Sequence, residues 1–148
     1  MAQWPGQADR SGGPDVSTTD AQPFGASIAP WLAVRDAQKA VAFYKAAFGA
    51  VELYRLDGDD GRPAVAQLSV GRAVFWVQED IDASPQASGK GSVRMILSVE
   101  DPDAVFDQAV AAGAAVVAPV HEAFGWRTGR VTDPSGHDWE TSRQLASS

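Results

Sequence analysis

The amino-acid sequence predicts an α+β fold in which two βαβββ modules form curved mixed sheets around a cup. The first observation is a repeat at an offset of 65 residues, because Val34-Arg35-Asp36 recurs as Val99-Glu100-Asp101 and Gly71 recurs as Gly136. A supersecondary unit that is duplicated and folded against its copy gives such a repeat. The second observation is the order of the apolar segments, which is strand, helix and three strands in each half.

The first module follows a segment, residues 1–26, that is rich in Gly, Pro, Ser, Thr, Asp and Gln and lacks hydrophobic periodicity. We expect this segment to be a flexible N-terminal tail and residues 27–148 to form a single domain. Asp36 is placed to cap a helix over residues 37–48, and Gly49 is placed to end it. The strands expected in this module, residues 27–80, are residues 28–34, 51–56, 64–70 and 73–78.

The second module, residues 92–145, follows a polar linker and repeats the pattern. Pro102 stands in the first turn of a helix that we expect to end at Ala112. The expected strands are residues 93–99, 114–119, 128–132 and 137–142. Between the second and third of these strands we expect a loop that carries His121, Phe124 and Trp126.

The composition excludes several classes of function. A net charge of −7, from 12 basic and 19 acidic residues, argues against nucleic acid as a partner and is compatible with a cationic ligand. The absence of cysteine excludes disulfides and thiolate nucleophiles. No stretch reaches the ~18 apolar residues of a membrane span. The N-terminus lacks the basic start and apolar run of a signal peptide, so we expect a cytoplasmic protein with no membrane partner.

Side chains alternate along a strand, so their parity sorts them into two faces. The set expected to pack under the helices is apolar and comprises Leu32, Val34, Ala66, Leu68, Val70, Val74, Trp76, Met95, Leu97, Val99 and Trp139. The opposite set mixes aromatic, charged and small residues and comprises Ala29, Trp31, Ala33, Val65, Gln67, Phe75, Arg94, Ile96, Ser98, Arg130, Thr132, Glu140 and Ser142. Aromatic side chains interleaved with charges indicate a ligand pocket, and a solvated sheet face is the alternative.

The duplicated βαβββ order, with Val34-Arg35-Asp36, Phe43-Tyr44 and Phe48-Gly49 in the first half and the run Asp-Pro-Ser-Gly-His-Asp-Trp-Glu at residues 133–140, resembles the vicinal oxygen chelate superfamily. This superfamily includes glyoxalase I, extradiol dioxygenases, epimerases, fosfomycin-resistance enzymes and bleomycin-resistance proteins. The resemblance covers roughly residues 27–145, and it implies a homodimer. Because one fold hosts many chemistries, the resemblance indicates the fold more strongly than the function.

Enzymes of this superfamily generally hold one divalent metal in the cup, through ligands at equivalent positions of the two modules. The resemblance assigns these positions to Ala29 and Arg94 on the first strand of each module, and to Phe75 and Glu140 on the last strand. Alanine and phenylalanine do not coordinate metals, and a guanidinium is a permanent cation. A catalytic zinc site uses three protein ligands, so we expect no metal and no other cofactor. A metal site rebuilt from Glu140 with two other side chains, His121 and Gln67, is the alternative.

The residues that replace the metal ligands suggest a different use of the cup. We expect Arg94 and Glu140 to form an ion pair across it, either as a brace or as part of a ligand site. Trp31 and Phe75 are placed to stack on a planar ligand. Orientation of the ligand would come from Arg130 and Gln67, and Trp126 would close the rim, with dimer contact as the alternative role of these aromatic residues. The candidate ligand-binding residues are therefore Trp31, Gln67, Phe75, Arg94, Trp126, Arg130 and Glu140.

The sequence-based hypothesis is a metal-free small-molecule binding protein of the glyoxalase/bleomycin-resistance type, which sequesters a planar drug or metabolite in an aromatic cup. The alternative is a metal-dependent glyoxalase- or epimerase-like lyase or isomerase that uses Glu140. A third hypothesis is a non-catalytic module that binds another protein. The sequence has no nucleophile elbow and no glycine-rich loop before a helix, which favours binding over catalysis.

Overall fold

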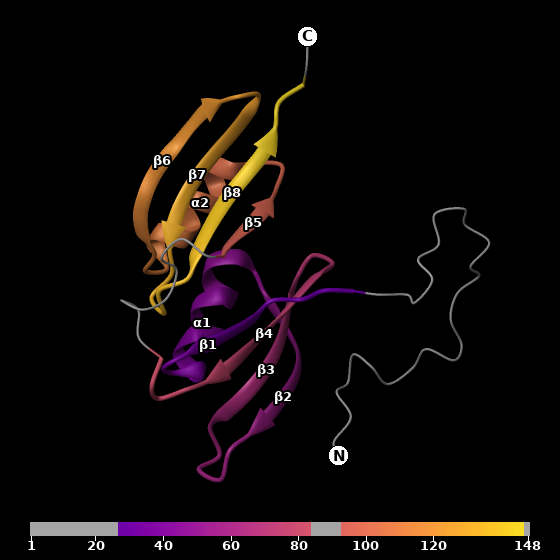
Figure 1. The fold of residues 1–148 in the computed structure, drawn as a ribbon, viewed down its shortest axis with the longest axis vertical. Helices are drawn as coiled ribbons and strands as arrows, with labels where there is room; N and C mark the ends of the chain where they lie inside the picture. The colour runs from indigo at the N-terminus through magenta and orange to yellow at the C-terminus, as the bar shows by residue number, and fades with distance from the viewer. Residues whose placement is uncertain (1–26, 84–92, 147–148) are drawn as a thin grey trace, which may run out of the picture.

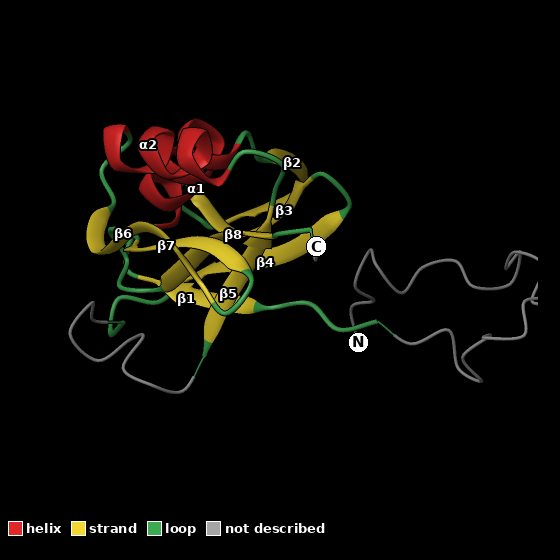
Figure 2. Ribbon diagram, turned by 90° about the horizontal axis from the view of Figure 1, so that it is seen from above, coloured by secondary structure: helices red, strands yellow, loops and turns green. Residues whose placement is uncertain are grey.

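Two four-stranded mixed sheets, one from each half of the chain, carry two helices on one side (Figures 1 and 2). This computed structural model describes residues 27–83 and 93–146, so the tail expected over residues 1–26 lies outside the described residues, as does most of the linker. In chain order the elements are β1 (Trp31–Val34), α1 (Ala37–Phe48), β2 (Val51–Asp57), β3 (Pro63–Val70), β4 (Ala73–Glu79), β5 (Arg94–Ser98), α2 (Pro102–Ala111), β6 (Ala115–Ala123), β7 (Trp126–Thr132) and β8 (Asp138–Gln144).

The two sheets have the same topology, β1-β4-β3-β2 and β5-β8-β7-β6. The first strand of each module pairs in parallel with the last strand, and the other neighbours are antiparallel. Strands that pair in parallel need a long crossover connection between them, and α1 and α2 form part of that connection in the first and second module. The predicted α+β fold with two βαβββ modules is confirmed. Neither helix described over residues 27–83 and 93–146 is long and apolar enough to cross a membrane.

The helix ends follow the predicted caps. The Asp36 carboxylate accepts a hydrogen bond of 3.1 Å from the backbone N–H of Lys39, and Gly49 ends α1 at a positive φ of 68°. Asp101 caps α2 in the same way, through the backbone N–H of Ala104 at 3.1 Å. A side-chain acceptor at the first position satisfies a backbone donor that has no partner within the helix.

The core lies between the helices and the sheets and joins the two modules through aromatic rings. Tyr44 and Phe48 of α1 contact Trp139 of β8, with ring centroids 5.4 and 4.7 Å apart. Phe75 of β4 lies in the same cluster, 5.2 Å from the Tyr44 ring and 5.4 Å from that of Trp139. Because these rings come from both halves of the chain, their burial stabilises the pair of modules together.

A buried carboxylate links α1 to the turn before β8. Asp133 is 3% exposed and accepts hydrogen bonds from the Tyr44 hydroxyl and, at 2.8 Å, from Trp139 Nε1. The backbone N–H groups of Ser135 and His137 donate to its other oxygen at 2.9 and 3.0 Å. Four donors thus replace the water that burial removes. Burial, together with the neighbouring carboxylate of Asp133, raises the pKa of Tyr44 well above its ordinary value.

Two expectations about the strands are wrong. The segment expected as a loop around His121 belongs to β6, which extends to Ala123, and Trp126 is the first residue of β7. In β4 the faces are reversed, because Phe75 is 4% exposed in the core under the helices while Trp76 lies on the opposite face. The predicted cup position of Phe75 is therefore corrected to Trp76.

The reversal in β4 comes from unequal turns. Between β3 and β4 the turn has two residues, since Val70 pairs with Ala73, whereas Thr132 pairs with Asp138 across a five-residue turn before β8. Counting from the glycine of each turn consequently compares positions that are not equivalent. A slip of one residue exchanges the two faces of a strand.

Candidate ligand site

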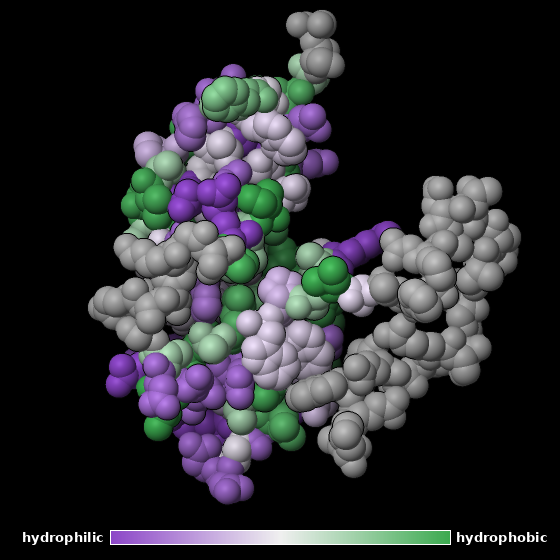
Figure 3. Space-filling view, viewed as in Figure 1, coloured by the Kyte–Doolittle hydropathy of each residue, from purple (hydrophilic) through white to green (hydrophobic). Residues whose placement is uncertain are grey.

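Each sheet carries one row of four side chains on the face away from the helices, and strand register defines the row. The first-module row consists of Trp31 (β1), Trp76 (β4), Gln67 (β3) and Tyr54 (β2). The second-module row consists of Ile96 (β5), Glu140 (β8), Arg130 (β7) and Ala118 (β6). The two rows occupy equivalent places in the two modules. In Figure 3, which shows this face with the helices behind it, hydrophilic and hydrophobic side chains are interspersed over both modules.

Three of the four side chains in the first-module row are aromatic. The rings of Trp31 and Trp76 stack with centroids 5.8 Å apart, and Tyr54 meets Trp76 edge-on at 6.1 Å. Trp31 Nε1 donates a hydrogen bond of 3.0 Å to the side chain of Gln78, which fixes the orientation of the indole. Although this hydrogen bond holds the indole in place, Trp31 is still 43% exposed to solvent. This row presents a flat aromatic surface with the Gln67 amide beside it.

The second-module row is polar at its centre. The expected ion pair is present, with Arg94 Nε 3.2 Å from Glu140 Oε1. The two residues lie on neighbouring strands of one sheet, so the pair does not cross the cup as expected. Arg130 forms a second pair on the same face, because its Nη2 lies 3.1 Å from Asp138 Oδ2. Both carboxylates are more buried than their arginine partners, so each pair shields a carboxylate that is partly withdrawn from water.

A cavity of about 330 Å³ opens beside the second-module row. It is lined by Ala118, His121, Ala123, Phe124, Trp126, Thr128, Gly129, Arg130 and Glu140. The volume falls at the lower end of the range typical of small-molecule sites. His121 Nδ1 donates a hydrogen bond of 2.9 Å to the Pro119 carbonyl, which leaves Nε2 as the other nitrogen of the ring. An indole, a phenyl ring and a guanidinium at one cavity suit a planar ligand with polar groups.

The structure divides the predicted site residues into three places. Trp126, Arg130 and Glu140 line the cavity, and Arg94 joins them through its ion pair. Trp31 and Gln67 lie in the row of the other module. Phe75 belongs to the core, so it is not available to a ligand on this face.

The prediction missed three residues on this face, namely Tyr54, Trp76 and Thr128. The parallel register of β1 with β4 places Trp76 beside Trp31. No sequence motif indicates that register, so the position of Trp76 could not be predicted from the sequence. Alternation along β7 from Arg130 does point to Thr128, which is two residues away on the same face.

The residues present do not fit the divalent metal that the fold family implies. The corrected register places Ala29, Arg94, Trp76 and Glu140 where ligands are expected, and only the last is a ligand type. Among residues 27–83 and 93–146, no group of three or more His, Cys, Asp or Glu side chains is arranged to hold an ion. The alternative set of His121, Glu140 and Gln67 is split between the two sheets.

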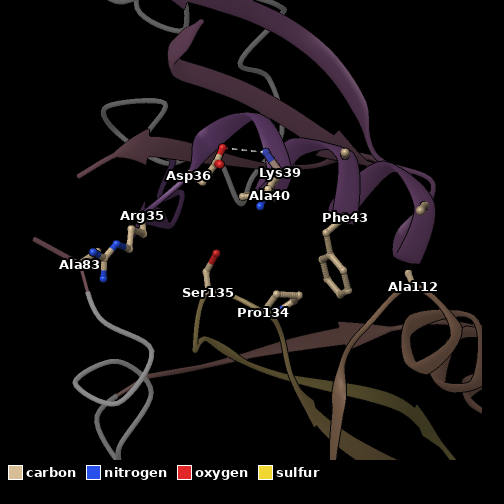
Figure 4. Close-up of a pocket in the computed structure, with 11 residues that line it drawn as sticks. Arg35, Asp36, Lys39, Ala40, Phe43, Ala83, Ala112, Pro134 and Ser135 are labelled. Carbon is tan, nitrogen blue, oxygen red and sulfur yellow. Dashed lines mark hydrogen bonds between the residues drawn. The ribbon is translucent and has the colours of Figure 1, made fainter. Parts of the chain in front are cut away.

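Two further cavities lie elsewhere. One, of about 260 Å³, lies where the modules meet and is lined largely by apolar side chains of β4 and β5, with the predicted site residues Phe75 and Arg94 among its lining. The other, of about 490 Å³, lies on the helix side between α1 and the Pro134-Ser135 turn (Figure 4). The Asp36 carboxylate, which lines the larger cavity, already accepts hydrogen bonds from the backbone N–H of Lys39 and, at 3.0 Å, from Arg62 Nη2. Neither of these cavities brings together the predicted orienting groups.

The chain is similar to known proteins over most of its length. It is 37% identical over 127 residues to an uncharacterized protein of Mycobacterium bovis, covering 80% of this chain and 84% of that one. The crystal structure of TioX from Micromonospora sp. ML1 matches with a TM-score of 0.65 and 31% identity, covering 82% of this chain and all of TioX (100%). An Arabidopsis thaliana gene product matches with a TM-score of 0.62 and 30% identity, covering 79% and 98% of the two chains.

A more distant structure has the same fold. The fosfomycin resistance protein FosX from Listeria monocytogenes matches with a TM-score of 0.64 at 16% identity, covering 81% of this chain and 93% of FosX. Residues 26–141 match the family described as Glyoxalase/Bleomycin resistance protein/Dioxygenase superfamily. The duplicated modules, the parallel first and last strands and this match agree, so the chain belongs to the Glyoxalase/Bleomycin resistance protein/Dioxygenase superfamily.

Proposed function

We propose that this protein binds a planar small molecule, a drug or a metabolite, without a metal and without transforming it. The observation that carries the proposal is the cavity of about 330 Å³ lined by Trp126, Arg130 and Glu140. Aromatic side chains supply contact area for a flat ring, and the two charged groups provide orientation.

The ion pair between Arg94 and Glu140 supports binding over metal-dependent catalysis. The Arg94 guanidinium, whose Nε lies 3.2 Å from Glu140 Oε1, already balances the charge of the single carboxylate among the expected ligand positions. A divalent ion placed beside Glu140 would also be repelled by the Arg94 guanidinium. No specific observation favours the alternative of a lyase or isomerase that uses Glu140.

A homodimer completes the site in this proposal. The cavity is lined by residues of the second module alone, and the first-module row lies on the other sheet of the same chain. The proposed dimer is one in which the first-module row of one copy faces the second-module row of its partner, and two-fold symmetry then gives two equal sites. A planar ligand is then held between an aromatic surface, with Trp31 and Trp76, and a polar one, with Arg130 and Glu140.

A ligand screen tests the proposal. Planar compounds that bind the native protein raise its melting temperature, and we expect Trp126→Ala to remove that shift while Leu53→Ala, which alters an exposed residue of β2, leaves it in place. Metal analysis of protein purified without chelator is the second measurement. One bound ion per chain, or turnover that a chelator abolishes, contradicts the proposal.

A further inference from the structure

Two buried polar atoms at the cavity have no hydrogen-bond partner among the described residues. These are Thr128 Oγ1 and Arg130 Nε. The two residues are alternate positions of β7, so their side chains share the face away from the helices, and both line the cavity of about 330 Å³. Buried polar atoms are nearly always paired in native proteins. Two unpaired atoms on one face of the same strand, two residues apart, call for a partner from outside the chain, either water or a ligand.

The charges around these atoms are already balanced. Arg130 is paired with Asp138 through Nη2 at 3.1 Å, and Asp138 accepts a further bond of 2.8 Å from the Thr132 hydroxyl. Glu140 is paired with Arg94. The unpaired groups are therefore one N–H, which only donates, and one hydroxyl, which can donate. They call for an acceptor atom, and the balanced ion pairs leave no net charge for a ligand ion to neutralise.

We propose that the ligand is an uncharged planar ring compound with a carbonyl oxygen, which accepts hydrogen bonds from both Thr128 Oγ1 and Arg130 Nε. This inference rests on the proposed function and defines the chemistry of its ligand. The ring lies toward Trp126, which is partly exposed at the cavity. Both polar atoms are closed to solvent in the free protein, so binding requires the Arg130 side chain, which is 35% exposed, to move aside. A carbonyl oxygen has two lone pairs and so accepts both bonds at once.

Thr128→Val separates this role from a structural one. The substitution keeps the shape of the side chain and removes an oxygen that has no partner. It should therefore leave the melting temperature of the free protein unchanged or raise it. The matched change, Thr132→Val on the same strand and face, removes a hydrogen bond that is made to Asp138 and should lower the melting temperature. A lower melting temperature for Thr128→Val contradicts the inference, because it means that the hydroxyl is already satisfied.

Binding is measured by calorimetry with four flat bicyclic probes that differ in their polar group. Chromone carries a neutral carbonyl, 2-naphthoate an anion and N-methylquinolinium a cation, while naphthalene carries no polar group. We expect chromone to bind at least about tenfold more tightly than naphthalene, which is the difference that one or two hydrogen bonds supply. This preference should weaken in Thr128→Val, which leaves the Arg130 Nε–H group as the remaining donor, and also in Arg130→Lys, which keeps the positive charge but lacks the Nε–H group.

The outcomes distinguish this inference from the function on which it rests. If chromone and naphthalene bind equally, or if either ion binds more tightly than chromone, a planar ligand is supported and a carbonyl acceptor is not. If none of the four probes binds, the proposed function fails as well. A preference for chromone that is unchanged in Thr128→Val also overturns the assignment of the oxygen to these donors.

Discussion

At the scale of single residues, the Arg94–Glu140 pair is partly exposed, since the Arg94 side chain is 44% and that of Glu140 19% exposed. Water therefore screens much of the attraction. We expect a double-mutant cycle with Arg94→Gln and Glu140→Gln to give a coupling energy of up to about 1 kcal/mol in urea unfolding. A coupling energy above about 3 kcal/mol would mean that the pair is a buried brace of the fold and not a ligand-site element.

The Tyr44 hydroxyl makes a hydrogen bond whose loss should be visible in stability. Tyr44→Phe removes one of the four donors to Asp133, in a place that water does not reach. We expect the free energy of unfolding to fall by about 1–3 kcal/mol. Tyr54→Phe is the matched control, because Tyr54 is half-buried on the sheet face and contacts Trp76 through its ring. Equal losses for the two substitutions would contradict the role given to Asp133.

The same tyrosine should make stability depend on pH in alkali. Burial raises the pKa of Tyr44 well above 10.0, so the folded protein keeps the neutral phenol while the unfolded chain ionises it. The stabilisation is complete below pH 10 and is lost as pH rises from there through the pKa of the folded state. Urea unfolding between pH 8 and pH 11.5 measures this loss, and Tyr44→Phe should flatten the profile by removing the contribution of Tyr44. The chain has two tyrosines, so in Tyr54→Phe the absorbance change on ionisation reports Tyr44 alone.

At the scale of elements, α2 approaches β7 through a glycine. A Cβ atom on Gly129 would lie 2.7 Å from Phe106 Cδ2 and 2.7 Å from Val120 Cγ2. Gly129→Ala should therefore push α2 from the sheet and lower the free energy of unfolding by about 1–3 kcal/mol. Gly58→Ala, where the nearest atom is a flexible carboxylate oxygen of Asp60 at 3.4 Å, is the control and should change it by less than about 0.5 kcal/mol. Urea unfolding of both variants checks the difference.

The helices could be predicted to within a residue, while the face of β4 could not. The ends of α1 depend on Asp36 and Gly49, whose roles are local and can be read directly from the sequence. The face of β4 depends on the length of the turn at Gly71 compared with that at Gly136. The 65-residue repeat aligns these two glycines, but Gly71 is the first residue of its turn and Gly136 the fourth. A count from each glycine therefore assigns the wrong face to β4.

The candidate site could be predicted in part for the same reason. The second-module residues Arg130 and Glu140 lie together, because alternation was counted correctly in β7 and β8. Trp126 joins them from the first position of β7, which the sequence had indicated as a loop. The aromatic row of the first module was only half found, since Trp76 was assigned to the core. Whether Thr128 has a hydrogen-bond partner depends on its surroundings in three dimensions, and sequence alone does not contain that information.

At the scale of the whole molecule, duplication has given two rows of equal geometry and different chemistry. The first-module row is aromatic, with Trp31 and Trp76, and the second-module row has Arg130 and Glu140 at its centre. Both helices lie on the same side of the sheets and pack together, with Gln108 Nε2 donating a bond of 2.8 Å to the Ala46 carbonyl (Figure 2). The helix-free faces are therefore the surfaces that the proposed dimer would use to complete the cup.

Mixing two variants that are each defective in ligand binding tests whether the site is formed by two copies of the chain. Trp31→Ala damages the first-module row and Arg130→Gln the second, so each homodimer has two defective sites. In a mixed dimer, the intact row of one copy faces the intact row of the other at one of its two sites. Random pairing should therefore restore about a quarter of the wild-type binding sites, as the symmetry of a two-fold dimer requires. Calorimetric stoichiometry of the co-refolded mixture, with sedimentation to establish the dimer, measures this number. A mixture with no restored sites, or a protein that sediments as a monomer, would place the whole site within one chain.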